Sequence, residues 1–226
     1  MWKKPAKAAE SGNEKSKIFQ ILTGVAVMDK KVLDHFRKTD KVLFSAAKKL
    51  NGKKLEPIKA KDLFAALCRE IIYQQLSGKV GNVIYGRFVK LFPNGKIEPK
   101  RILKLPAQKI RNIGTSWNKV DFMKDLAKKV VSKEIVLENL HKLDNESVIQ
   151  ELTKVKGIGR WTAEMFLMFS LGREDVFSPG DLGLRRSIEN LYKMRNVTPE
   201  KAEKISSRWS PYRTYASLAL WAMHDN

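Results

Sequence analysis

The chain has 226 residues, of which 43% are hydrophobic, so it can bury a sizeable core. Its 44 Lys and Arg residues outnumber the 24 Asp and Glu residues, and the net charge of +20 favours a polyanionic partner, nucleic acid before a membrane surface. The single cysteine, Cys68, excludes an internal disulfide and a four-cysteine iron–sulfur cluster, and the three histidines are too far apart in sequence for a zinc site.

The first segment, residues 1–17, is polar and rich in lysine, which is typical of a flexible basic tail. Residues 18–226 are expected to form one helical domain, in which residues 18–50 supply two or three amphipathic helices, for example over 31–36 and 42–50. No stretch alternates like a strand, and no run approaches the roughly 18 apolar residues of a membrane-spanning helix. The expected fold class is therefore all-α.

The next two helices are separated by a polar corner. Asp62 is a typical N-cap for a helix that stops near Ser77, and a second helix is expected over residues 79–91. The corner between them, residues 74–77, reads Gln-Gln-Leu-Ser. Considered alone, this polar stretch is typical of the end of a helix.

The remaining helices outside the central motif are marked by capping residues. A short helix is expected over residues 106–112, and Ser116 and Ser147 are placed to cap the two helices that follow. Thr198 and Ser210 each precede a proline, which is the pattern of an N-cap followed by Pro at the first helical position.

The centre of the chain predicts two helices joined by a glycine hairpin. Residues 156–159 read Lys-Gly-Ile-Gly, which is too short and too rich in glycine for anything but a turn. A buried helix is expected over residues 160–171, with Gly172 at its end. Such a hairpin turns backbone N–H groups outward, where they can hold a DNA phosphate, and Ile158 is expected to anchor it in the core.

Two side chains near this hairpin have ordinary structural explanations when they are considered alone. Asp181 precedes a helix expected over residues 182–191 and is a favoured type of N-cap. Trp161 lies on the buried helix and is compatible with a core position.

Ordered motifs along most of the chain, from Leu63 to Trp221, change that interpretation. The hairpin is followed by Arg-Trp-Thr-Ala at residues 160–163, and the loop at residues 176–183 reads Val-Phe-Ser-Pro-Gly-Asp-Leu-Gly. Together with residues 74–77, 114–116 and 211–213, these motifs resemble those of the helix-hairpin-helix (HhH-GPD) DNA glycosylases, in their alkylbase or 3-methyladenine branch. The resemblance implies two interlocked helical lobes with a DNA cleft between them, a hairpin motif over about residues 147–171 and a catalytic loop over 175–183.

The resemblance also implies a reaction. A monofunctional enzyme of this branch flips alkylated purines, such as 3-methyladenine and 7-methylguanine, out of duplex DNA and hydrolyses the glycosidic bond, leaving an abasic site. Asp181 matches the essential aspartate, whose carboxylate would stabilise the cationic sugar. Trp161 stands where relatives that also nick the strand hold a lysine, and an indole cannot form their Schiff base, so no lyase activity is expected.

The family match assigns the other site residues. Trp161, Trp221, Tyr73 and Trp117 are the predicted walls of an aromatic base pocket. The predicted DNA-binding residues are Gln74, Gln75, Leu76, Ser77, Lys156, Gly157, Ile158, Gly159, Arg160 and Thr162. Within that set, either Gln75 or Leu76 would fill the gap left by the flipped nucleotide. A Na⁺ or K⁺ ion at the hairpin carbonyls near Val155 and Gly157 is possible in this family, and no other cofactor is expected.

Several alternatives stay open at the level of sequence. The same fold could act mainly on deaminated or etheno purines, or the chain could be a helix-hairpin-helix DNA-binding module without catalysis. Arg213 could pair with a carboxylate or with a phosphate. The expected partner is damaged duplex DNA, with no membrane and no obligate protein partner. The expected location is the cytoplasm and nucleoid in a prokaryote or the nucleus in a eukaryote.

Overall fold

The computed structural model of the protein describes residues 28–50 and 56–224. The predicted tail over residues 1–17, and whatever residues 18–27 contribute to the predicted N-terminal helices, lie outside that range. Within it the regular elements are helices, and strand pairing is limited to one isolated antiparallel bridge between Lys59 and Leu171. The all-α prediction is confirmed.

Twelve α-helices and three short 3₁₀ helices make up the described part of the chain. The α-helices are α2 (Lys30–Thr39), α3 (Lys41–Lys48), α4 (Leu63–Tyr73), α5 (Gly78–Val89), α6 (Pro99–Lys104), α7 (Ala107–Arg111), α8 (Trp117–Val131), α9 (Asn145–Thr153), α10 (Arg160–Phe169), α11 (Leu182–Tyr192), α12 (Pro199–Ser206) and α13 (Arg213–His224). The 3₁₀ helices are η1 (Pro93–Gly95), η2 (Leu137–Lys142) and η3 (Ser207–Trp209).

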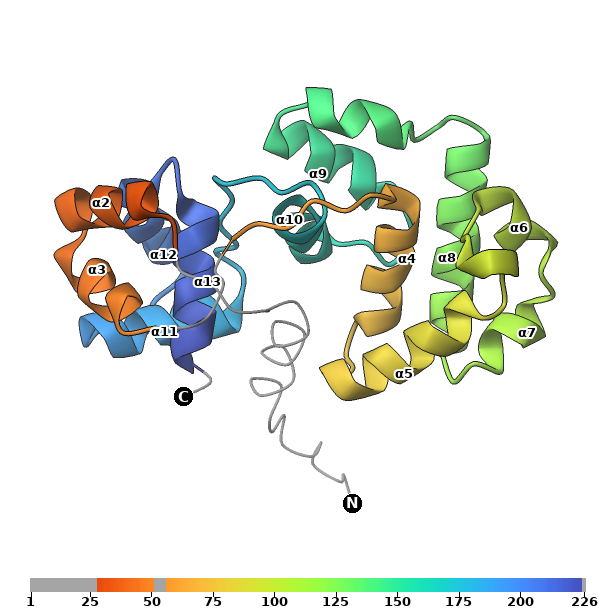
Figure 1. Ribbon diagram of the computed structural model, residues 1–226, viewed down its shortest axis with the longest axis horizontal. Helices are drawn as coiled ribbons and strands as arrows, with labels where there is room; N and C mark the ends of the chain where they lie inside the picture. Colours follow the sequence, from red (N-terminus) through yellow and green to blue (C-terminus); the bar gives the residue numbers. More distant parts are fainter. Residues whose placement is uncertain (1–27, 51–55, 225–226) are drawn as a thin grey trace, which may run out of the picture.

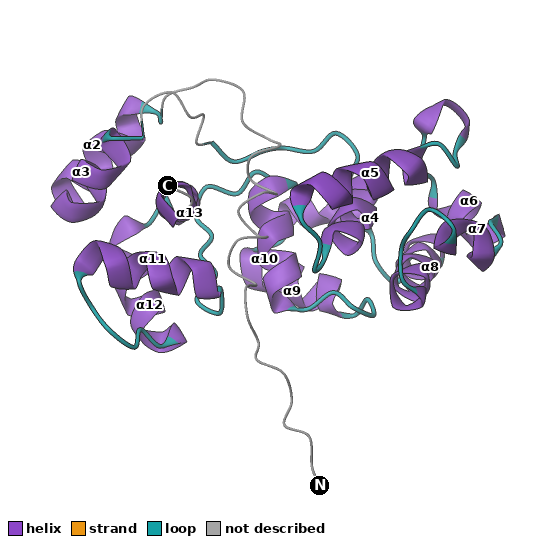
Figure 2. Cartoon of the chain, turned by 90° about the horizontal axis from the view of Figure 1, so that it is seen from below, coloured by secondary structure: helices purple, strands orange, loops and turns teal. Residues whose placement is uncertain are grey.

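The helices form two lobes, and one of them contains both ends of the described chain (Figure 1). Figure 1 shows α2 and α3 in one lobe with α11, α12 and α13, while α4 to α8 form the other and α10 lies between them. The chain crosses between the lobes beside α10, where Ile58 N–H donates to Met168 O over 3.3 Å and Ala60 N–H donates to Ser170 O over 2.8 Å. The lobes are therefore interlocked, as expected, and α10 is their common element (Figure 2).

A buried carboxylate ties the N-terminal helices to the C-terminal part of the chain. Asp40, 5% exposed, lies at the start of α3. Its Oδ2 atom accepts hydrogen bonds from Tyr192 Oη at 2.6 Å and from Trp209 Nε1 at 2.9 Å, and Arg208 Nε lies 3.1 Å away. Because a buried charge is costly unless it is paired and hydrogen-bonded, these donors make the contact between the two segments specific.

Most of the predicted helix starts are confirmed, and two are wrong. Asp62, Ser116 and Thr198 each accept a hydrogen bond from a backbone N–H in the first turn of the following helix. The predicted cap Ser147 lies inside α9. The N-cap of that helix is Asp144, whose carboxylate accepts the N–H of Ser147 at 2.9 Å.

The second wrong cap is Ser210. Its hydroxyl donates to Asp175 Oδ2 over 2.9 Å, and α13 begins only at Arg213, so Ser210 is not the residue that precedes the helix. The helix predicted to stop near Ser77 also ends earlier, at Tyr73, and the sequence analysis did not foresee α6. The first difference places a short turn where a continuous apolar pattern suggested helix, and the second adds a helix that begins at Pro99.

Across residues 28–50 and 56–224, no helix is both long and apolar enough to cross a membrane. The same residues contain no cluster of three or more His, Cys, Asp or Glu side chains that could hold a metal ion. Cys68 is a free, fully buried thiol.

Candidate active site

The hairpin between α9 and α10 is held against α8. Gly157 has a φ of +77°, and a Cβ atom built there would lie 2.1 Å from Phe122 Cδ2, so only glycine fits. Ile158, 3% exposed, anchors the turn in the core as predicted. Gly159 differs from Gly157, because it has a negative φ of −90° and a Cβ built there would meet nothing within 4 Å. One glycine therefore packs inward while the other is open to an approaching molecule.

Fewer hairpin N–H groups face outward than expected. Asp125 Oδ2 accepts the N–H of Lys156 at 2.9 Å, and Val155 O accepts the N–H of Ile158 at 3.1 Å. Within the described chain, the N–H groups of Gly157 and Gly159 have no acceptor, and the N-cap of α10 makes no side-chain hydrogen bond. These two N–H groups, at the positive end of the α10 dipole, form a small site for an anionic oxygen.

The corner between α4 and α5 is joined to this hairpin. Gln74 Nε2 donates to Gly157 O over 2.8 Å and to Thr162 Oγ1 over 3.3 Å. Lys119, in the first turn of α8, donates from Nζ to Ile72 O over 2.8 Å and to Gln74 O over 2.6 Å. Burial lowers the pKa of this lysine. The corner is thus clamped on both sides, from the hairpin and from α8.

The clamped corner projects one residue outward. Gln75 is exposed and has a φ of +57°, a left-handed conformation that a non-glycine residue rarely adopts. Leu76 is partly buried against the core, and Ser77 accepts the N–H of Val80 as the N-cap of α5. Of the two residues predicted to fill the gap in DNA, Gln75 is the more exposed.

Asp181 is buried, with 1% of its surface exposed, at the start of α11. Its Oδ1 atom accepts the N–H of Leu184 at 2.9 Å, which confirms the predicted cap. Two indoles also donate to the same carboxylate: Trp161 Nε1 to Oδ2 at 2.7 Å and Trp221 Nε1 to Oδ1 at 3.3 Å. Capping and the two indoles together hold the carboxylate in one orientation.

The loop that carries Asp181 is also fastened to α10 by a second carboxylate. Glu164, 4% exposed, accepts a short hydrogen bond from Ser178 Oγ. Burial raises the pKa of Glu164, while the bond from Ser178 and the charge of Arg160 oppose that rise. Trp161 and Glu164 are three residues apart and so share one face of α10, from which both contact the loop.

Trp221 has an aromatic neighbour that the sequence analysis did not name. The rings of Phe169 and Trp221 lie 6.1 Å apart between centroids at an interplanar angle of 34°. Gly183 lies beside them, and a Cβ atom built there would be 3.1 Å from Asp181 Oδ1 and 3.6 Å from Trp221 Nε1. An alanine at position 183 would therefore crowd the carboxylate of Asp181 and only touch the indole of Trp221.

Two of the four predicted base-pocket residues do not lie at this site. Tyr73 is 1% exposed, its hydroxyl donates to Asn82, and its ring contacts Gly81 and the guanidinium of Arg69, so it has no face left for a base. Trp117 is 49% exposed at the start of α8, which Figures 1 and 2 both place on the far side of α4 from α11. Only Trp161 and Trp221 are brought together with Asp181.

Two of the predicted DNA-binding side chains are buried, and a third is exposed but paired with carboxylates. Thr162 is buried and accepts from Gln74, and the side chain of Ile158 is buried, so neither side chain can reach DNA. The guanidinium of Arg160 donates to Glu146 through Nη1 at 2.9 Å and Nη2 at 2.7 Å, and its Nε donates to Glu164 at 3.2 Å. The two carboxylates neutralise the charge that was expected to attract a phosphate.

Arg213 pairs with a carboxylate, which settles one open alternative. Its Nε donates to Asp175 Oδ1 over 2.7 Å, and Nη1 lies 3.2 Å from Glu203 Oε1. Burial raises the pKa of Asp175, but the hydrogen bonds from Arg213 and Ser210 outweigh burial and hold that pKa below its ordinary value.

Glu164 and Phe169 were missed by the sequence analysis. Glu164 is the single acidic residue in the buried sequence of α10, and a lone charge in an apolar helix was the signal that could have identified it. Phe169 carried no comparable signal, because its pairing with Trp221 depends on the packing of α10 against α13.

Comparisons with known proteins show which family the chain belongs to. Residues 68–211 match the model of the HhH-GPD superfamily of base excision DNA repair proteins. The chain is 37% identical over 164 residues to DNA-3-methyladenine glycosylase 1 of Schizosaccharomyces pombe, an alignment that covers 71% of this chain and 72% of that protein. It is 31% identical to a putative DNA-3-methyladenine glycosylase of Bacillus subtilis, over 84% of this chain and 67% of that protein.

Two solved structures are similar over most of the chain. One is the 3-methyladenine DNA glycosylase of Schizosaccharomyces pombe in complex with abasic DNA, with a TM-score of 0.76, 33% identity and coverage of 85% of this chain and 95% of that one. The other is a DNA-3-methyladenine glycosidase from Bacillus halodurans, with a TM-score of 0.78, 33% identity and coverage of 89% and 92%.

Proposed function

The chain belongs to the HhH-GPD superfamily of base excision DNA repair proteins, and on that premise we propose that it is a monofunctional DNA glycosylase for alkylated purines. It excises bases of the 3-methyladenine and 7-methylguanine type from duplex DNA and leaves an abasic site. The names of the relatives support the activity and the alkylated-base substrate class.

The observation that carries this proposal is the buried carboxylate of Asp181 between two indoles. Departure of a purine leaves positive charge on the deoxyribose, and a carboxylate already fixed in a dry site stabilises that charge without reorganisation. The N–H donors Trp161, Trp221 and Leu184 fix the carboxylate before the substrate arrives. Removing one such electrostatic contact from an enzyme costs on the order of a hundredfold in rate.

The indoles have a second role in the proposal. Both indoles lie at the carboxylate, and Trp221 packs against Phe169, so an extruded purine that reaches Asp181 would meet aromatic rings. An alkylated purine carries positive charge, so contact with an aromatic face gains about 0.5–2 kcal/mol from cation–π attraction. Undamaged purines lack this gain, which favours excision of the damaged base.

The corner and the hairpin position the DNA. Gln75 projects from the clamped corner and is the candidate to fill the gap left by the extruded nucleotide. The hairpin N–H groups of Gly157 and Gly159 hold a backbone phosphate, together with the exposed Lys156. A hairpin cation, if bound, would be held by the carbonyls of Val155 and Gly157, each of which keeps a second lone pair, and would add positive charge facing that phosphate.

The absence of lyase activity is part of the proposal, and Trp161 supports it. A β-lyase needs an amine beside the sugar, and position 161 offers an indole that donates to Asp181. The nearest lysines in sequence are placed elsewhere: Lys154 pairs with Glu151 on α9, and Lys156 is exposed on the hairpin.

The alternative of a DNA-binding module without catalysis leaves the site unexplained. Burying a carboxylate costs several kcal/mol unless hydrogen bonds compensate, and an exposed cap would serve α11 as well. The buried Asp181 with two tryptophan donors is required for the glycosylase and superfluous for a module.

The experiment is incubation of the purified protein with methylated duplex DNA, followed by chromatography of the released bases. The proposal expects free 3-methyladenine and 7-methylguanine, strands that stay intact until treated with alkali, and no covalent adduct on addition of borohydride. Unmethylated duplex is the control. Release no faster than in buffer contradicts the glycosylase, and an efficiently trapped adduct contradicts the monofunctional assignment.

A further inference from the structure

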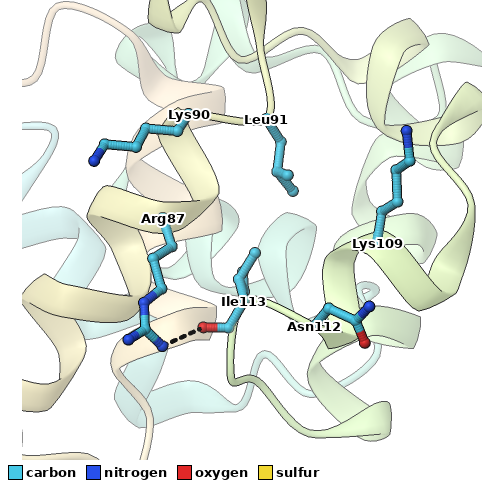
Figure 3. Close-up of a pocket in the computed structure, with 6 residues that line it drawn as sticks. All are labelled: Arg87, Lys90, Leu91, Lys109, Asn112 and Ile113. Carbon is cyan, nitrogen blue, oxygen red and sulfur yellow. Dashed lines mark hydrogen bonds between the residues drawn. The ribbon is translucent and has the colours of Figure 1, made fainter.

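An open pocket of about 370 Å³ lies between the C-terminal end of α5 and α7, away from Asp181. It is lined by Arg87, Lys90, Leu91, Lys109, Asn112 and Ile113 (Figure 3). Its volume lies in the range of small-molecule sites. Nothing in the proposed reaction uses it.

The pocket offers positive charge and hydrogen-bond donors to a ligand. Arg87, Lys90 and Lys109 are three cations, and no lining residue is acidic. Within the described chain, none of the three makes an ion pair. Three cations at one pocket without a counter-charge repel one another, so an anion bound there would relieve that repulsion.

Two of the polar groups are already oriented. Arg87 Nη1 donates to Ile113 O over 3.3 Å, which holds the guanidinium at the pocket wall while its other N–H groups remain for a ligand. Asn112 Oδ1 accepts from Gln108 Nε2 at 2.7 Å. Because the amide oxygen is engaged there, the group that Asn112 can present to a ligand is its NH₂ donor.

The rest of the lining is apolar. Leu91 and Ile113 face the space between the cations in Figure 3. A bare inorganic ion would leave this apolar surface uncovered. A phosphate joined to a sugar would place its oxygens on the donors and its ring carbons on Leu91 and Ile113.

The pocket lies at the end of a helix face that begins at the DNA corner. Val80, Val83, Arg87 and Lys90 are exposed and recur at intervals of three, four and three residues, which places them on one side of α5. Arg87 is nine residues beyond Gly78, so at a rise of 1.5 Å per residue it lies roughly 14 Å along α5 from the start of the helix. A duplex lying along this face would have a phosphate near Arg87 about four base pairs beyond the corner, at 3.4 Å per base pair.

We propose that this pocket holds a backbone phosphate and its deoxyribose from the duplex that the enzyme is repairing, several base pairs from the damaged base. This inference rests on the proposed function. It extends the DNA contact from the hairpin and the corner to the outer end of the α4–α8 lobe. The contact carries no sequence information and serves to fix the register of the duplex.

The test compares two charge-neutralised variants. The first carries Arg87→Gln, Lys90→Gln and Lys109→Gln. The matched control, Arg195→Gln with Lys201→Gln and Lys204→Gln, removes the same charge from exposed positions in the other lobe. A Lys90→Gln/Lys109→Gln double variant leaves the hydrogen bond from Arg87 to Ile113 intact and keeps the test valid if loss of Arg87 disturbs the fold.

Binding is measured on duplexes of about 20 and about 8 base pairs, each with a central abasic-site analogue, over a range of salt concentrations. For the pocket variant on the long duplex, affinity should fall several-fold and the slope of log K against log salt should decrease by about 0.9, the value for one phosphate contact. On the short duplex, which ends before the pocket, the pocket variant and the control should be alike. The proposal is overturned if the pocket variant and the control lose the same affinity for the long duplex. It is also overturned if the additional loss of affinity in the pocket variant is as large on the short duplex as on the long one.

A second arm separates the source of the phosphate. Deoxyadenosine monophosphate and inorganic phosphate are titrated into wild-type protein, with the signals of the pocket residues followed by NMR. Tight saturation by the free nucleotide together with unchanged duplex binding in the pocket variant would assign the site to a free ligand and overturn the DNA assignment. Base release from methylated DNA by wild-type protein is scored separately, so failure of the pocket and failure of the glycosylase are distinguishable.

Discussion

Trp161 and Asp181 are joined by a hydrogen bond of 2.7 Å from the indole Nε1 to the carboxylate Oδ2. A residue in the first turn of α10 therefore contacts the N-cap of α11. The hairpin proposed to bind DNA is thus connected directly to the carboxylate proposed to act on the sugar. This connection makes the position of the carboxylate dependent on α10.

Replacing Trp161 with Phe tests that dependence. The change removes the N–H donor and keeps an aromatic ring, so Asp181 loses a charge-assisted bond of about 1.5–3 kcal/mol. We expect the single-turnover excision rate to fall about tenfold or more. The matched control is Trp117→Phe, the same substitution at an exposed indole on α8, which should leave the rate unchanged. A Trp161→Phe enzyme as fast as wild type would show that the bond has no catalytic role.

The two hairpin glycines should respond differently to alanine. Gly157→Ala forces a Cβ atom to within 2.1 Å of Phe122 at a φ of +77°, so the fold should lose several kcal/mol of unfolding free energy. Gly159→Ala meets nothing within 4 Å and should leave the unfolding free energy nearly unchanged. It should nevertheless weaken binding to every DNA sequence alike, because the added methyl group obstructs the approach of a phosphate. Urea denaturation and duplex titration measure the two effects, and normal DNA affinity in a folded Gly159→Ala variant would exclude this hairpin contact.

Local patterns in the sequence predict the secondary structure and the centre of the site well. The Gly-Ile-Gly turn, the buried helix after it and Asp181 as a cap all follow from short-range rules, and all are present. The motif order along the chain added the grouping of Trp161, Trp221 and Asp181, which no local rule provides. Local rules therefore predict the elements, and the order of the motifs predicts which side chains meet at the site.

Partners that lie far apart in sequence could not be predicted. Thr162 and Arg160 seemed available for DNA until the fold placed Gln74 and Glu146 beside them. Tyr73 was predicted to line the base pocket because it is aromatic and lies next to a motif. The sequence around an aromatic residue does not distinguish a residue that lines a site from one that fills the core. Its close contact with Gly81 comes from the packing of α5 on α4.

Lys119 should act on the corner and not on the chemistry. Lys119→Met removes the ammonium that donates to Ile72 O and Gln74 O, so the corner that carries Gln75 should loosen. We expect weaker binding of damaged duplex, with the excision rate at saturating enzyme little changed. Lys124→Met is the control, since Lys124 Nζ donates to Leu105 O over 2.8 Å on the same helix and lies away from the corner. Equal effects of both substitutions on DNA binding would contradict a specific role for Lys119.

The pair of Asp175 and Arg213 gives a pH dependence of stability. The pKa of Asp175 is lowered from 3.8 in the folded protein, so the pair contributes stability above the unfolded pKa and loses it as pH falls through the folded value. At pH 7, Asp175→Asn should reduce the unfolding free energy by about 1–3 kcal/mol, toward the lower end because the side chain is partly exposed. The difference from wild type should shrink toward zero as the pH falls below 3.8.

Urea denaturation of both proteins across this pH range measures the effect. Glu203→Gln removes the more exposed partner of Arg213 and should cost less than about 1 kcal/mol. A difference between Asp175→Asn and wild type that stays constant down to the lowest pH would mean that the ionised carboxylate is not the source of the stability.

The charge of Asp181 is the centre of the account, and Asp181→Asn removes it with little change in shape. The amide keeps one acceptor oxygen, but its NH₂ group must face one of the donors Leu184, Trp161 or Trp221, so we expect a loss of about 1–3 kcal/mol in unfolding free energy. Asp62→Asn, which alters the cap of α4, controls for the loss of a carboxylate cap. Assays must be run where both variants are folded.

The decisive measurement is the single-turnover excision rate of Asp181→Asn on duplexes that contain hypoxanthine or 7-methylguanine. Loss of the carboxylate should slow hypoxanthine release by a hundredfold or more, equivalent to about 3 kcal/mol of transition-state energy. The effect on 7-methylguanine should be smaller, because that base already carries positive charge and leaves with less help. Binding of damaged duplex should survive or tighten, because the amide repels phosphates less than the carboxylate does. A folded Asp181→Asn enzyme that releases hypoxanthine at the wild-type rate would contradict the account.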